Sequence, residues 1–355
     1  MLDISPYVPG KSDSGSTKRI IKLSSNETPL GTSDKVLNVL KNSTINPYRY
    51  PDGSANNLRE ALAKKHSLGK DRIICGNGSD EILSLLAHCF SGPGDEVIYS
   101  QHGFLVYPIA VKAAGATPVV APEKNLRADV AAIIKLSTNN TKLCYIANPN
   151  NPTGTYLSIE ELVALRRGLP EETILVIDSA YAEYVEKSDY SDGINLVNKY
   201  DNIVCTRTFS KIYGLAALRI GWMYASRDIV EYMNRIRLPF NTNSIAQTAA
   251  IEALKDNDFI KNAKKHNDIW KPWIEKKLQE IGLDTVDGVA NFVLVKFNNE
   301  LQANLCYQFL EKKGILVRSI KEYKLPEYLR ITVGLEEENK IMCEEIKNFL
   351  NYYEK

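Results

Sequence analysis

The chain has 355 residues, which is long for one hydrophobic core and more typical of two domains. Its 44 lysine and arginine residues nearly balance 43 aspartate and glutamate residues, so the net charge of +1 gives no general attraction to nucleic acid or membrane. The six cysteines stand far apart without a Cys-x-x-Cys motif, which argues against a disulfide framework or a zinc site. These features favour a reducing cytoplasm and a small-molecule partner.

The N-terminus is polar and interrupted by prolines, so it lacks the apolar middle of a secretory signal. No uninterrupted apolar run approaches the ~20 residues that are needed to span a bilayer. A Ser- and Gly-rich patch at residues 10–17 predicts a mobile arm. A short strand at residues 20–23, the loop 24–31 and a helix from about Asp34 are expected to follow it.

An amphipathic helix is predicted at residues 57–66, after a turn that contains Pro51 and Gly53. From Arg72 onward, short β-branched runs alternate with helical periods. Such alternation predicts an α/β domain with a mostly parallel sheet and helices on both faces. Its expected strands are residues 72–75, 96–100, 117–120, 143–147, 174–178 and 203–206.

After about residue 244 the pattern changes to long charged helices, and residues 255–258 indicate a turn or helix boundary. Strands and short helices are expected at residues 292–297, 301–312, 315–318 and 329–333, before a C-terminal helix from Glu336. This pattern predicts a smaller α+β domain that the N-terminal residues complete. We therefore place the large domain at residues 46–250 and the small domain at residues 1–45 and 251–355.

In open sheets of this kind, ligands bind beyond the carboxyl ends of the strands, where several polar motifs occur here. Gly76-Asn77-Gly78-Ser79-Asp80-Glu81 follows the first expected strand of the sheet and opens an apolar helix. Glycine lets the backbone approach a ligand, and a helix N-terminus offers free N–H groups, so phosphate could dock on Gly78, Ser79 and Asp80. Ser79 or Asp80 could instead simply cap the helix.

Three further strand ends carry candidate groups. Phe104, after the strand at 96–100, could stack on a flat heteroaromatic ring or pack in the core. Residues 148–154, Asn-Pro-Asn-Asn-Pro-Thr-Gly, form a rigid loop that presents the amide of Asn151. Asp178 ends a buried strand, and because a buried unpaired carboxylate is costly, it should have a cationic or proton-donating partner, although it could also cap a helix.

Residues 206–222, TRTFSKIYGLAALRIGW, place Lys211 directly after Ser210 and eight residues before Arg219. A lysine near a cation or in a desolvated pocket has a lowered pKa and attacks an aldehyde more readily. A guanidinium can hold a phosphate through a two-pronged fork. Ser-Lys alone is a common surface dipeptide, whereas the whole pattern predicts a covalent cofactor.

The pattern Ser-Lys-x-x-Gly-Leu-x-x-x-Arg-x-Gly resembles the active-site lysine segment of the fold-type I aminotransferases, which use pyridoxal 5'-phosphate. The resemblance implies a mostly parallel seven-stranded sheet flanked by helices, with a smaller α+β domain. It implies that Lys211 forms a Schiff base with the cofactor aldehyde, that Asp178 keeps the pyridinium nitrogen protonated, and that Asn151 and Tyr181 meet the phenolic oxygen. Lys211, Asp178 and Tyr181 would be catalytic; the implied cofactor contacts are Gly78, Ser79, Asp80, Phe104, Asn151, Asp178, Tyr181, Thr208, Ser210, Lys211 and Arg219.

Three segments, residues 5–11, 76–81 and 314–318, resemble the histidinol-phosphate aminotransferases more specifically. This resemblance implies transfer of an amino group between L-histidinol phosphate and 2-oxoglutarate in histidine biosynthesis, giving imidazole acetol phosphate and L-glutamate. It further implies a homodimer with shared active sites, in which Tyr50 of one subunit reaches the cofactor phosphate of the other. The implied substrate-binding residues are Tyr7 and Arg318 for phosphate, Arg330 for the carboxylate or its equivalent, and Asn26.

The sequence departs from the family pattern at two places, and it is compatible with several alternative functions. Ser179 replaces a usual glutamate but leaves the two functional positions, Asp178 and Tyr181, undisturbed. His102-Gly103-Phe104 replaces a common Pro-Thr-aromatic sequence, which together with the tyrosine-rich composition leaves aromatic or a broad range of amino acids as possible donors.

A decarboxylase of a phosphorylated amino acid would share the fold and the lysine but need no oxo-acid acceptor. A catalytically silent binding or regulatory protein of this fold would normally lack the lysine or the aspartate. A nucleotide-binding oxidoreductase would need a glycine fingerprint that is absent from this sequence. Arg318 and Arg330 could also form ordinary ion pairs.

Overall fold

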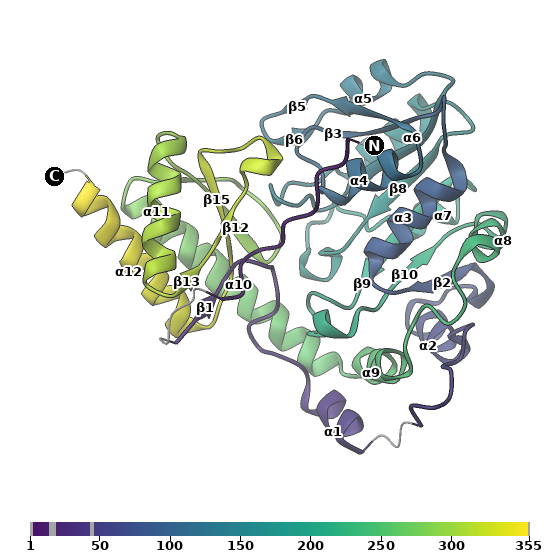
Figure 1. The fold of residues 1–355 in the computed structure, drawn as a ribbon, viewed down its shortest axis with the longest axis horizontal. Helices are drawn as coiled ribbons and strands as arrows, with labels where there is room; N and C mark the ends of the chain where they lie inside the picture. Colours follow the sequence, from purple (N-terminus) through teal and green to yellow (C-terminus); the bar gives the residue numbers. More distant parts are fainter. Residues whose placement is uncertain (1–2, 14–18, 43–45, 354–355) are drawn as a thin grey trace.

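The computed structural model describes residues 3–13, 19–42 and 46–353. Figure 1 shows a large body around one wide sheet and a smaller body around a second sheet, with a long helix, α10 (Asn257–Glu280), running between them. Part of the arm predicted at residues 10–17 lies outside the described residues. Within the described ranges, no helix has both the length and the apolar character needed to cross a bilayer.

The large sheet has seven strands in the order β2-β10-β9-β8-β7-β3-β4, which confirms the predicted mostly parallel α/β sheet. Six strands run in one direction, and β10 is antiparallel to both of its neighbours. The strand β10 is absent from the strands expected from sequence. The bounds are β2 (Ile73–Gly76), β3 (Glu96–Ser100), β4 (Thr117–Ala121), β7 (Thr141–Ala147), β8 (Ile174–Asp178), β9 (Ile203–Thr208) and β10 (Gly221–Tyr224).

Helices cover both faces of this sheet, because alternate residues of each strand point to opposite faces and pack in two separate apolar layers. Cys144 and Ile146 of β7 pack in one layer, whereas Leu143 and Tyr145 pack in the other. The helices are α1 (Asp34–Asn42), α2 (Asn56–His66), α3 (Ser79–Phe90), α4 (Val106–Ala113), α5 (Val130–Leu136), α6 (Ile159–Gly168), α7 (Ile194–Val197), α8 (Arg227–Ile236) and α9 (Ser244–Lys255). A hairpin of β5 (Glu123–Lys124) and β6 (Arg127–Ala128) and the short 3-10 helices η1 (Lys70–Arg72), η2 (Ala182–Tyr184) and η3 (Ala216–Leu218) complete this part.

The small sheet is antiparallel, in the order β11-β12-β15-β14, and it packs with α10, α11 and α12. The N-terminal strand β1 (Ile21–Lys22) pairs in parallel with β13 (Ile315–Leu316), which joins this strand to the small domain. Asp256 caps α10 directly after α9, which confirms the predicted helix boundary. The domain limits at 45/46 and 250/251 stay predictions. The other bounds are β11 (Asp284–Thr285), β12 (Phe292–Lys296), α11 (Glu300–Lys312), β14 (Arg318–Ser319), η4 (Lys321–Tyr323), β15 (Tyr328–Thr332) and α12 (Glu336–Tyr353).

Candidate active site

A cavity of about 240 Å³ lies where the carboxyl ends of β7, β8 and β9 face the N-terminal segment and β15. This is the edge of an open α/β sheet at which ligands bind. Segments that are far apart in sequence meet here, from Tyr7 to Arg330. Thirteen of the predicted site residues line the cavity: Tyr7, Asn26, Ser79, Asp80, Phe104, Asn151, Asp178, Tyr181, Thr208, Ser210, Lys211, Arg219 and Arg330.

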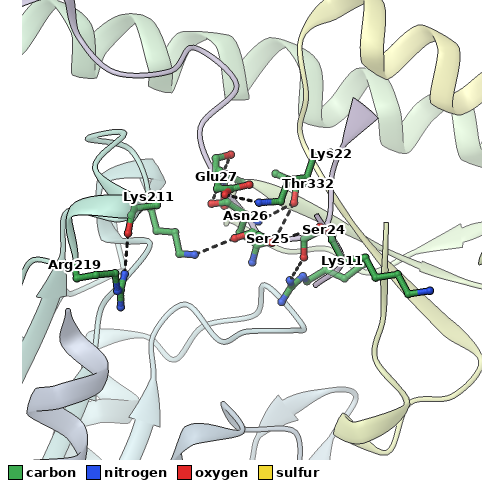
Figure 2. Close-up of polar contacts among 12 residues, drawn as sticks. Lys11, Lys22, Ser24, Ser25, Asn26, Glu27, Lys211, Arg219 and Thr332 are labelled. Atoms are coloured by element: carbon green, nitrogen blue, oxygen red, sulfur yellow. Dashed lines mark hydrogen bonds and ion pairs between the residues drawn. The ribbon is translucent and has the colours of Figure 1, made fainter. Parts of the chain in front are cut away.

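Lys211 follows β9, and its Nζ donates a hydrogen bond of 3.2 Å to the carbonyl oxygen of Ser25. Figure 2 shows this amine extending toward the N-terminal loop, with Arg219 nearby. Burial lowers the pKa of Lys211 from 10.5 to about 8, and the charge of Arg330 acts in the same direction. An amine whose pKa is lowered toward neutral pH gives up its proton more readily, and so becomes a competent nucleophile and proton acceptor.

Asp178 is buried at the end of β8 and accepts two hydrogen bonds, from the hydroxyl of Tyr107 at 3.0 Å and from Thr206 Oγ1 at 3.1 Å. Burial raises its pKa from 3.8 to about 6, and both hydrogen bonds oppose that rise. The sequence predicted a proton-donating or cationic partner but identified neither Tyr107 nor Thr206. Tyr107 stacks on Tyr145 with 4.9 Å between ring centroids, so its hydroxyl is held in a fixed direction.

Arg219, Ser210 and Gly78 form one wall of the cavity. The guanidinium donates to Ser210 Oγ at 3.2 Å and forms an ion pair with Asp80 at 3.0 Å. A Cβ atom added at Gly78 would lie 2.4 Å from Arg219 Nη2, and the φ of +86° would strain any other residue, so glycine suits this close approach. Since α3 begins at Ser79, its N-terminal N–H groups meet the same wall, and the arrangement suits an anion.

Arg330 and the N-terminal loop form the opposite wall. The guanidinium of Arg330 donates to Asn151 Oδ1 and to the carbonyl oxygen of Ser24, the latter at 2.9 Å. The side chain of Asn26 donates to the hydroxyl of Tyr181 at 2.9 Å. The backbone N–H of Asn26 donates to Thr332 Oγ1, also at 2.9 Å (Figure 2). The carbonyls of this loop contribute contacts that no side-chain pattern predicts.

Three predicted residues do not line the cavity. Gly78 lies behind Arg219, as described above. Arg318 is buried on β14 opposite Arg330 and donates to the carbonyl oxygen of Val8 at 2.6 Å. Tyr50 is 81% exposed and stacks on Phe240, and its role at a neighbouring subunit's cofactor stays a prediction.

The structure describes no group of three or more histidine, cysteine, aspartate or glutamate residues in the ranges 3–13, 19–42 and 46–353 that could hold a metal ion. The side chains that line the cavity include amine, carboxyl, hydroxyl, amide and guanidinium groups. Together these can bind anions and move protons. The roles assigned from sequence to individual residues stay predictions.

Comparison with known proteins identifies the family. A family model described as aminotransferase class I and II matches residues 18–346. A curated histidinol-phosphate aminotransferase of Rhodopseudomonas palustris (strain BisB18) is 49% identical over 353 residues, which cover 99% of this chain and 97% of the relative. A crystal structure of histidinol-phosphate aminotransferase from Sinorhizobium meliloti in complex with pyridoxal-5'-phosphate has a TM-score of 0.89 at 26% identity, over 96% of this chain and 93% of that chain.

The fold is also shared by a protein of different chemistry. The structure of L-threonine-O-3-phosphate decarboxylase from Porphyromonas gingivalis has a TM-score of 0.82 at 23% identity, over 94% of this chain and 100% of that chain. The fold alone therefore does not distinguish amino transfer from decarboxylation.

The hydrogen bond from Tyr107 to Asp178 generates a pH-dependent prediction. We expect Tyr107→Phe to lower the free energy of unfolding by about 1.5–3 kcal/mol at pH 8, where Asp178 is ionised and accepts a charge-assisted bond. The cost should be smaller at pH 5, because with a pKa of about 6 the carboxyl is then protonated. Urea unfolding at both pH values, in the cofactor-free enzyme, measures the difference.

Tyr145→Phe is the matched control for this measurement. Tyr145 stacks on Tyr107 and donates its hydroxyl to the neutral carbonyl of Leu83 at 2.8 Å, so its loss should cost the same at pH 5 and pH 8. Equal pH dependence in the two variants would contradict the role given to Tyr107.

The lowered pKa of Lys211 generates a second prediction. Below pH 8 the buried amine of Lys211 is charged in the folded state, and its burial lowers the free energy of unfolding by the full amount. Between pH 8 and 10.5 the amine is neutral in the folded state but still charged in the unfolded state, so this loss of stability decreases as the pH rises. Lys211→Met removes this loss, so we expect the Tm of the cofactor-free enzyme to rise by about 1–3 °C at pH 7 and the gain to shrink toward pH 10. Calorimetry, with the exposed Lys261→Met as control, tests this; a gain that does not change with pH would refute it.

Proposed function

The chain belongs to the class I and II aminotransferases, and we propose from this premise that it transfers the amino group of L-histidinol phosphate to 2-oxoglutarate. The products are imidazole acetol phosphate and L-glutamate, and the reaction belongs to histidine biosynthesis. The observation that carries the choice of donor is a pair of buried arginines, Arg318 and Arg330, directly opposite each other on adjacent strands. Close similarity to curated enzymes of this activity over nearly the whole chain supports it.

The residues of the cavity fit pyridoxal 5'-phosphate. The wall at Gly78 excludes a Cβ atom and presents Ser210, Arg219 and the N-terminus of α3 to an anion, which suits the cofactor phosphate. Asp178, buried with a raised pKa, is suited to hold a proton-bearing ring nitrogen that would stabilise its charge. Lys211 stands near both, with its pKa lowered toward neutrality.

When bound, pyridoxal 5'-phosphate supplies an aldehyde that takes up the amino group and a ring that accepts electrons. Lys211 would hold the aldehyde end of the cofactor through its Nζ before substrate arrives and, once freed, would move the proton of the substrate carbon as a general base and acid. Asp178 would hold the protonated ring nitrogen. Asn151 and Tyr181 would bind the phenolic oxygen, and Asn26 fixes the Tyr181 hydroxyl through its hydrogen bond of 2.9 Å.

The arginine pair also explains how one pocket serves both substrates. Arg318 does not line the cavity itself, but its charge acts on Tyr7, which does, so the two together would bind the phosphate of the amino donor. Arg330 would bind the anionic or polar group nearer the reacting carbon. Guanidinium groups can take phosphate or carboxylate through the same fork. The dicarboxylate 2-oxoglutarate therefore occupies the site in the second half of the reaction.

We place this enzyme in the cytoplasm as a homodimer. Tyr48, Tyr50, Leu238 and Phe240 are large apolar side chains exposed on the surface of the described chain, with Tyr50 stacked on Phe240 at 4.5 Å. A second copy that covers them would bring Tyr50 toward the neighbouring cofactor phosphate. This supports shared active sites.

The direct test follows glutamate formation by purified enzyme with pyridoxal 5'-phosphate, L-histidinol phosphate and 2-oxoglutarate. We expect one glutamate per imidazole acetol phosphate, no carbon dioxide, and a much lower kcat/KM with L-phenylalanine. Lys211→Ala should lose nearly all turnover, while the exposed Lys261→Ala should keep it. Faster transfer from L-phenylalanine would reassign the enzyme to aromatic donors, and carbon dioxide release without an oxo-acid acceptor would indicate a decarboxylase.

A further inference from the structure

The imidazole of His102 is buried at the contact between the two domains. Its Nδ1 lies 2.6 Å from the backbone carbonyl oxygen of Tyr323, in η4 of the small domain. Because a carbonyl oxygen can only accept, Nδ1 carries the proton and donates it. His102 itself follows β3 of the large sheet, so this hydrogen bond ties one domain to the other.

The backbone of His102 is fixed on the large-domain side. Its N–H donates to Glu123 Oε1 at 3.0 Å, and its carbonyl oxygen accepts from Asn150 Nδ2 at 3.2 Å. Asn150 precedes Asn151, whose Oδ1 accepts from Arg330. One side of His102 is thus connected, through a single loop, to the first arginine of the substrate pair.

The other side leads to the second arginine. Tyr323 stands five residues after Arg318, and its N–H donates to the carbonyl oxygen of Ile320 at 3.0 Å, which makes the connecting turn tight. Tyr323 and Ile320 are buried in one apolar cluster with Leu294 of the same domain, so the turn is packed as well as hydrogen-bonded. A shift of the Tyr323 carbonyl would therefore carry Arg318 with it.

We propose that His102 is a positioning residue that fixes Arg318 at the place where it holds the phosphate of the amino donor. It thereby sets the preference of the enzyme for phosphorylated over unphosphorylated donors. This inference rests on the proposed function. Without the Nδ1 proton the buried Tyr323 carbonyl would lose its donor, and the small-domain turn would relax away from the large domain.

Three variants separate this role from general damage to the fold. His102→Leu removes the donor, whereas His102→Asn keeps one, since Asn Nδ2 can take the place of His Nδ1. His88→Leu is the matched control, because Nδ1 of His88 also bonds a backbone carbonyl, that of Ser84 at 2.8 Å, but within α3 and on the surface.

The measurement compares L-histidinol phosphate with L-histidinol, which lacks only the phosphate, in the enzyme carrying its cofactor. For His102→Leu we expect kcat/KM to fall about tenfold or more with L-histidinol phosphate, mainly through KM, and less than about twofold with L-histidinol. His102→Asn and His88→Leu should retain most of the wild-type preference. Amide hydrogen exchange of cofactor-free enzyme should be faster in residues 318–323 of His102→Leu than in His102→Asn.

Equal losses for both donors in His102→Leu would overturn the inference and leave His102 a merely structural residue. So would an unchanged preference, or a His102→Asn variant as impaired as His102→Leu. If the wild-type enzyme itself does not prefer L-histidinol phosphate to L-histidinol, the proposed donor is wrong and the inference falls with it. The wild-type comparison therefore distinguishes the two failures.

Discussion

The guanidinium of Arg330 is the contact on which the arrangement of the site depends. It lies on the small sheet, yet it donates to Asn151 of the large domain and to the carbonyl of Ser24 in the N-terminal segment, so three separate parts of the chain meet on one buried group. An arginine keeps its charge even when buried. Together with burial, that charge lowers the pKa of Lys211 to about 8, so the same residue closes the cavity and sets its electrostatics.

Burial moves the pKa values of Lys211 and Asp178 toward neutral pH from opposite directions. The pKa of Lys211 falls to about 8 and that of Asp178 rises to about 6, each with burial as the main cause. Opposed shifts of this kind mark sites that move protons near neutral pH. The hydroxyls of Tyr107 and Thr206 limit the rise at Asp178, so its carboxyl is largely ionised at pH 7 and can hold a cationic ring nitrogen.

The sequence predicted the elements whose formation depends on short local patterns of residues. The strands at residues 96–100 and 174–178 have the bounds expected, because each is a short β-branched run with a polar group at its end. The strand β10 (Gly221–Tyr224) was not predicted because it begins within the last two residues of the lysine motif and is buried on both faces, without alternation. Tyr107 could not be assigned to Asp178, since 71 residues separate them and only the packing of α4 on the sheet brings them together. The hydrogen bond between His102 and the carbonyl of Tyr323 could not be predicted either, because only the tertiary structure brings these two residues together.

The hydrogen-bond partners of a buried arginine indicate whether it stabilises the fold or is available to bind a ligand. Arg207 is also buried, but it pairs with two carboxylates, Glu183 at 2.8 Å and Asp192 at 2.5 Å, so its charge is compensated within the fold. The hydrogen-bond partners that the described structure gives Arg318 and Arg330 are neutral oxygens. Residues directly opposite on antiparallel strands project from the same face, so two uncompensated charges stand side by side. Burying like charges together is costly unless an anion relieves it, and a ligand with two anionic ends supplies that relief.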